Sequence, residues 1–167
     1  MPLVNKNVNT IPAYKIVKGS GAPPPVPTVN WKMVLEPVDP LNTFDVAGYQ
    51  FNLTGPAGTN NIAGATAGPA DPGFTFSIGP QTILAFGFSG EQFTVTAAGQ
   101  HIVNLQMTNT NILPLGTSIN GPNLIASSPT GATWNVDVYV RTLGYPAPGI
   151  LTQQQAPADI VAYLIQL

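Results

Sequence analysis

From Trp31 onward, the chain is a series of short runs in which apolar and polar residues alternate, with glycine, proline and asparagine between the runs. The runs are WKMVLE, GYQFNL, FTFSI, TILAFGF, FTVT, HIVNLQM, WNVDVYV and DIVAYLIQL. A period of two is typical of a strand that is buried on one face, and no segment sustains the i, i+3, i+4, i+7 apolar spacing of a helix. These runs predict an all-β, two-sheet antiparallel sandwich, and they favour a jelly roll.

A surface with few charges is the second constraint. Charged residues make up 7% of the 167 residues, whereas an ordinary soluble domain has about 25%. Hydrophobic residues reach 44%, so the chain has enough apolar surface for a folded core and does not have the composition of a disordered protein. A surface of Asn, Gln, Thr, Ser and Gly repels neighbouring molecules weakly, which suits a protein that belongs to an assembly.

The first 30 residues differ in pattern from the rest of the chain. They show no amphipathic period, and GSGAPPPVPT (19–28) joins a flexible Gly-Ser-Gly to a stiff polyproline-II stretch. We therefore divide the chain into an extended, basic, proline-rich arm at 1–30 and a jelly-roll sandwich at 31–167.

The net charge of −2 hides a difference between these two parts. Residues 1–32 carry four lysines and no acid, a net charge of +4, and residues 33–167 carry one arginine and seven acids, a net charge of −6. The lysines are Lys6, Lys15, Lys18 and Lys32. A basic arm can bind nucleic acid, but four dispersed lysines without arginine give a weak electrostatic footprint. Docking against an acidic protein explains the charge as well, and we expect a protein partner for Lys6, Lys15 and Lys18.

No segment of the sequence is expected to direct the protein to a membrane or to classical export. The start, MPLVNKNVNT, lacks the basic-then-apolar pattern of a signal peptide, and no apolar run approaches the roughly 18 residues that span a bilayer. The chain has no cysteine, so it has neither disulfides nor a thiolate metal site.

The final run, DIVAYLIQL (159–167), is apolar on both faces. One face carries Ile160, Ala162 and Leu164, and the other carries Val161, Tyr163, Ile165 and Leu167. A two-sheet sandwich covers only one face of each sheet, so the second face needs another cover. In a chain without predicted helices, we expect that cover to be another subunit. The predicted interface residues are Ile102, Tyr163, Ile165 and Leu167.

FTVTAAGQHIVNLQM (93–107) resembles a strand-turn-strand segment of tumour-necrosis-factor-like and complement-globular-head-like jelly rolls. In that family, an F-x-V strand is followed by a turn of small residues. A Gly-x-aromatic motif then leads into a strand of alternating apolar and polar residues. TSINGPNL (117–124) is similar to their edge segment, and WNVDVYV and DIVAYLIQL are similar to their later strands. The resemblance covers about residues 85–167 and implies a homotrimer. It departs from the family at His101, which stands where the aromatic is usual, and in the absence of a recognisable acidic Gly-Asp turn.

Two function classes follow from the arm, the low charge and the resemblance, which fit the virus and phage members of this architecture best. The first is a capsid decoration or cement protein, a homotrimer on the virion surface. It would be assembled in the host cytoplasm and bound through its arm to the major capsid protein or another shell protein. The second is a receptor-binding knob of a viral or phage spike or fibre, with Tyr139 and Tyr145 as candidate contacts to a glycan or protein. A knob usually follows a coiled coil or repetitive stalk, and residues 1–30 contain neither, so decoration is favoured.

The sequence offers little for catalysis. His101 is the only histidine, and the alternation places it in an apolar row, which favours a structural role. GTSING (116–121) lacks the second glycine and the following helix of a nucleophile elbow. Asp39 and Asp45 could offer oxygens to calcium, but aspartates in Pro- and Asn-rich loops are typical turn formers. We therefore expect no enzyme, no metal and no cofactor.

Overall fold

The computed structural model describes residues 21–54, 62–108, 112–122, 131–141, 149–152 and 158–167. Every regular element in these residues is a strand, so the prediction of an all-β fold is confirmed. The strands are β1 (Val29–Pro37), β2 (Phe44–Val46), β3 (Gly48–Thr54), β4 (Ile62–Ala67), β5 (Thr75–Ile78), β6 (Thr82–Phe86), β7 (Phe93–Val95), β8 (Gln100–Met107), β9 (Leu113–Asn120), β10 (Thr133–Trp134), β11 (Val136–Arg141), β12 (Gly149–Thr152) and β13 (Ile160–Gln166). Within this part of the chain, no helix is long and apolar enough to cross a membrane.

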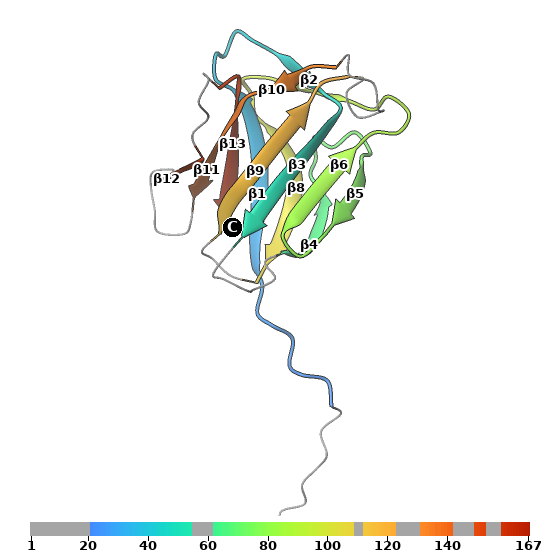
Figure 1. Ribbon diagram of the computed structural model, residues 1–167, viewed down its shortest axis with the longest axis vertical. Helices are drawn as coiled ribbons and strands as arrows, with labels where there is room; N and C mark the ends of the chain where they lie inside the picture. Colours follow the sequence, from blue (N-terminus) through green and yellow to red (C-terminus); the bar gives the residue numbers. More distant parts are fainter. Residues whose placement is uncertain (1–20, 55–61, 109–111, 123–130, 142–148, 153–157) are drawn as a thin grey trace, which may run out of the picture.

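The strands form a sandwich-like arrangement of two large sheets and one small one. The six-stranded sheet has the order β12-β11-β13-β1-β8-β4, the five-stranded sheet has the order β10-β9-β3-β6-β5, and β2 pairs with β7. Figure 1 shows the five-stranded sheet lying across the six-stranded one. The pairings are antiparallel except that of β11 with β13, which is parallel. This pair corrects the wholly antiparallel sandwich that the sequence predicts.

The core lies between the sheets and follows the predicted alternation. On β1, Trp31, Met33 and Leu35 are fully buried, and each such side chain stabilises the fold by roughly 1.5–3 kcal/mol. On β3 and β13 too, alternate side chains are fully buried. They are Tyr49, Phe51 and Leu53 on β3, and Ile160, Ala162 and Leu164 on β13. The predicted inward face of the last strand is thus the core face.

Four strands are not among the predicted runs: β2, β4, β9 and β12. The sequence of β4, IAGATA, has only small side chains after Ile62, so it gives no alternating hydrophobic signal. It forms an edge of the six-stranded sheet because it pairs with β8 alone. β9 ends at Asn120, where the Asn-Gly turn is expected, but it lies between β10 and β3.

An extra residue interrupts the alternation of β8. Val103 lies opposite Met33 and His101 lies opposite Val34, so Ile102 has no partner of its own on β1. Ile102 and Val103 are both fully buried, as in a β-bulge where two successive side chains share one face. Because of this bulge, His101 lies opposite the outward-facing Val34 and not on the face of Val103, which corrects its predicted position in an apolar row.

Backbone contacts from the turn after β4 hold the bulge in place. The Gly68 N–H donates to the carbonyl oxygen of Ile102 (2.9 Å), and the Ala70 N–H donates to that of His101 (3.0 Å). A Cβ atom on Gly68 would stand 2.4 Å from the His101 carbonyl oxygen, closer than real side chains approach backbone. The glycine is therefore required for the close approach of this turn to β8.

The chain passes from one sheet to the other at Asn135. Trp134 on β10 belongs to the five-stranded sheet, and Val136 on β11 belongs to the six-stranded sheet. The Asn135 N–H donates to Asp159 Oδ2 (3.0 Å), and its carbonyl oxygen accepts from the N–H groups of Asp159 (2.9 Å) and Ile160 (3.1 Å). These bonds fix the start of β13 beside that of β11.

The described part of the arm, residues 21–28, is exposed and has no regular secondary structure. Figure 1 shows it extending away from the sandwich below the start of β1. The first strand begins at Val29, two residues before the boundary that the sequence suggests.

Candidate interaction surfaces

The outer face of the six-stranded sheet, which is turned away from the core, carries apolar side chains near its centre. On β13, Val161, Tyr163 and Ile165 are half-buried and alternate with the fully buried residues of the core face. Such large side chains, on a sheet face that the described residues leave uncovered, are a candidate surface for contact with another molecule.

Four outer-face residues form a row across neighbouring strands, which we call the aromatic row: Tyr139, Tyr163, Val34 and His101. Their order follows from the register, in which Tyr139 lies opposite Tyr163, Tyr163 opposite Val34, and Val34 opposite His101. The Tyr139 and Tyr163 ring centroids are 5.8 Å apart. All four side chains are partly exposed, so the row combines apolar area with the polar ends of two tyrosines and a histidine.

The histidine of the row has a local partner. His101 Nε2 lies 2.9 Å from Asn104 Oδ1, and since an amide oxygen only accepts, the tautomer with a proton on Nε2 donates this bond. Asn104 Nδ2 in turn donates to the carbonyl oxygen of Ala67 on β4 (3.2 Å). His101 thus has a structural partner, and among the described residues that partner is an amide and not the carboxylate that would orient a general base.

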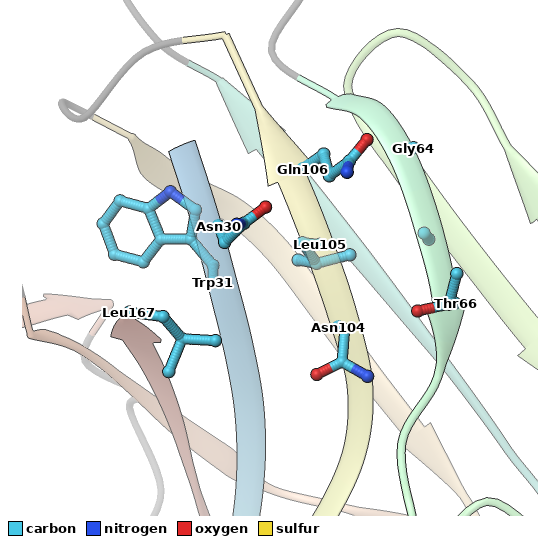
Figure 2. A pocket seen from close by; sticks show the side chains of 9 residues that line it. Asn30, Trp31, Gly64, Thr66, Asn104, Leu105, Gln106 and Leu167 are labelled. Carbon is cyan, nitrogen blue, oxygen red and sulfur yellow. The ribbon is translucent and has the colours of Figure 1, made fainter. Parts of the chain in front are cut away.

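Beside the aromatic row, towards β4, the surface is hollowed into a groove of about 360 Å³, which we call the amide groove. The side chains that define it are those of Asn30, Thr66, Asn104, Gln106 and Leu167, with Gly64 on β4. Figure 2 shows Asn30 and Gln106 between Leu167 on one side and Gly64 and Thr66 on the other. Trp31, Ala65 and Leu105 complete the lining, which contains no charged residue.

Three polar side chains of the groove are available to a ligand. Asn30, Thr66 and Gln106 are exposed, and their side chains make no hydrogen bond within the described residues. Gly64 keeps the groove open next to Gln106, because a Cβ atom on Gly64 would lie 3.3 Å from Gln106 Oε1.

The predicted interface residues fall on different surfaces. Tyr163 and Ile165 lie on the outer face, and Leu167 is 55% exposed at the wall of the amide groove. Ile102 lies in the core because of the bulge, so it contributes nothing to the surface of the single chain. Of the candidate ligand contacts, Tyr139 lies in the aromatic row. Outside the described residues are Tyr145, Lys6, Lys15 and Lys18.

Three acidic side chains, including the two considered as calcium ligands, have structural partners. Asp39 Oδ1 accepts from the Leu41 N–H (2.9 Å), and Asp45 Oδ1 accepts from Thr94 Oγ1 (2.7 Å). Hydrogen bonds from the loop backbone around Ser89 lower the pKa of Glu91. Nowhere in the described residues do three His, Asp or Glu side chains gather as metal ligands would.

Sequence reasoning did not relate the buried Tyr49 to Asp71, a half-buried residue in the segment after β4. Burial raises the pKa of the Tyr49 hydroxyl well above its ordinary value of 10.0, and the nearby Asp71 carboxylate raises it further. Neither the Tyr49 hydroxyl nor Asp71 Oδ2 has a hydrogen-bond partner in the described structure. The other carboxylate oxygen, Asp71 Oδ1, accepts from the N–H groups of Gly73 (2.8 Å) and Phe74 (2.9 Å).

This pair predicts a loss of stability in alkali. Above pH 10 the unfolded chain releases the Tyr49 proton and the folded chain keeps it, so the free energy of unfolding falls by up to about 1.4 kcal/mol per pH unit. Tyr49→Phe is expected to remove this part of the slope and to leave stability at pH 7 equal or higher, because the orphan hydroxyl is gone. Urea unfolding of both proteins at pH 8 and pH 11 measures the difference, and equal slopes would contradict the assignment.

The described residues therefore offer two candidate surfaces for binding, the aromatic row and the amide groove. Comparison with known proteins adds no relative: no family model, no curated protein and no solved structure matches the chain.

Proposed function

We propose that this protein is a structural virion protein, a homotrimer that decorates or cements a viral or phage capsid through its N-terminal arm. The observation that carries the proposal is the exposed segment 21–28, which extends away from a sandwich that has few charged residues. An arm of this kind gains ordered contacts only on a partner, because it buries too little surface alone to offset its chain entropy. The partner in this proposal is the major capsid protein or another shell protein.

The outer face supports the trimeric part of the proposal. Tyr163 and Ile165 place apolar area on a sheet face that no other part of the described chain covers. A neighbouring subunit would remove this area from water, at about 25 cal/mol for each Å². The number of three subunits comes from the resemblance to trimeric jelly rolls, and that resemblance is part of the same proposal.

The opposite end of the sandwich favours a second candidate, a receptor-binding knob. Phe88, in the segment between β6 and β7, is 76% exposed and packs edge-on against Phe86 with ring centroids 4.7 Å apart. Figure 1 places this segment at the end of the sandwich away from the arm. An exposed aromatic in such a position suits contact with a receptor.

The copy number on purified particles tests the choice between the two. A decoration protein is expected to be present in numbers comparable with those of the shell protein, because it binds a repeated site. A knob is expected at a few copies for each particle. Quantitative mass spectrometry of the particles, with the shell protein as internal standard, gives the ratio. A ratio near that of tail or fibre proteins would reject decoration.

A further inference from the structure

We propose that the amide groove is a binding site for a neutral carbohydrate. This goes beyond capsid decoration, since it gives the body of the protein a ligand that neither the arm nor the subunit interface requires. The proposal rests on the chemistry of the lining, on its arrangement across three strands and on the space that Gly64 leaves.

The lining matches hydroxyl groups better than charged groups. Each amide side chain offers both a donor and an acceptor, and so does the hydroxyl of Thr66; a sugar hydroxyl also does both. A phosphate or carboxylate ligand is bound through Arg, Lys or a cluster of backbone donors, and a cation through carboxylates. Since no side chain in the lining is charged, a neutral polyhydroxylated ligand is the class that these side chains can satisfy.

The free side chains stand in fixed positions on neighbouring strands. Asn30 on β1 lies opposite Gln106 on β8, and Gln106 lies opposite Gly64 on β4. Two residues further along β4 and on the same face of the sheet, Thr66 lies opposite Asn104 of β8. Adjacent strands are about 4.8 Å apart, so the polar groups form a grid fixed by the sheet itself, and a ligand does not have to order a loop in order to bind.

The groove also offers space and an apolar wall. A ligand that lies over Gly64 approaches the sheet closely, because no side chain stands there, while the exposed Leu167 can contact the apolar C–H face of a sugar.

Saturation-transfer NMR on the full chain tests the site with neutral mono- to trisaccharides of glucose, galactose, mannose and N-acetylglucosamine. At least one of these sugars is expected to bind at millimolar or lower concentration. Gln106→Ala is expected to weaken that binding about tenfold, by loss of one hydrogen-bonding amide, and Gly64→Val is expected to abolish it by filling the groove. The matched controls are Gln92→Ala, an exposed glutamine outside the groove, and Ala63→Val on the same strand as Gly64.

Circular dichroism and size-exclusion chromatography show whether each variant keeps the fold and assembly of the parent, which separates a failure of this proposal from a failure of the trimer. Absence of binding to every sugar of the panel overturns the proposal. So does sugar binding that survives both Gln106→Ala and Gly64→Val in folded protein. If instead an extended peptide binds to the edge of β4, with unchanged affinity in Gln106→Ala, the groove serves strand addition and the carbohydrate assignment fails.

Discussion

Deletion of residues 1–28 is expected to leave a folded trimer that no longer binds the particle. The first strand begins at Val29, so the deletion removes no strand and none of the buried core residues of the described structure. If the arm supplies the contacts to the shell, its removal should reduce attachment to background. Co-sedimentation of purified protein with particles that lack it measures the loss.

The charge of the arm gives a matched second variant. Replacing Lys6, Lys15 and Lys18 with glutamine keeps the length of the arm and removes three of the four positive charges of residues 1–32. Attachment to an acidic shell should then weaken and lose much of its dependence on salt, because screened attraction between charges falls as ionic strength rises. Undiminished binding of the truncated trimer would remove the main support for decoration and would favour the receptor-binding knob.

Replacing Tyr163 and Ile165 together with aspartate is expected to give monomers or insoluble protein in place of the proposed trimer. Both side chains lie on the outer face of β13, so two carboxylates there would be buried without partners in a subunit interface. Light scattering after size-exclusion chromatography should report a mass near the 17.4 kDa of one chain, where the parent should show three times that mass.

A pair of exposed strand residues on the other sheet serves as the control for added charge. Thr75 and Ser77 on β5 are both exposed, so their replacement with aspartate should leave the trimer intact. His101→Phe should also preserve assembly, because the Asn104 contact is a local one. Trimers of unchanged stability in the Tyr163 and Ile165 double variant would contradict the interface assignment.

Alternation predicts strands and their buried faces well where the strands are regular. The eight predicted runs all contain strands, and the core face of β13 is the one expected, because a sheet that is covered on one side requires a period of two. The prediction fails at Ile102, where a single inserted residue moves His101 to the outer face. Nothing in HIVNLQM signals the bulge, since it depends on the backbone of Gly68 and Ala70 from a distant turn.

The amide groove could not be predicted from the sequence. It joins Asn30, Gln106 and Gly64, which come from three strands, and their meeting depends on a sheet order that alternation does not encode. β4 itself was missed because Gly and Ala give no hydrophobic contrast. The parallel pairing of β11 with β13 was missed for a related reason, since the polarity pattern of a strand is the same in either direction.

The position of β13 in the six-stranded sheet sets the order of events during synthesis. β13 lies between β11 and β1, so the sheet cannot close until a strand more than a hundred residues downstream of β1 has left the ribosome. Until then, the edges of β1 and β11 that pair with β13 expose unpaired backbone groups to other nascent chains. Such distant pairing slows folding, and it gives a partly made subunit time to associate wrongly. A low level of expression, which keeps fewer unfinished chains present together, or a chaperone that covers β1 should therefore raise the yield of native protein.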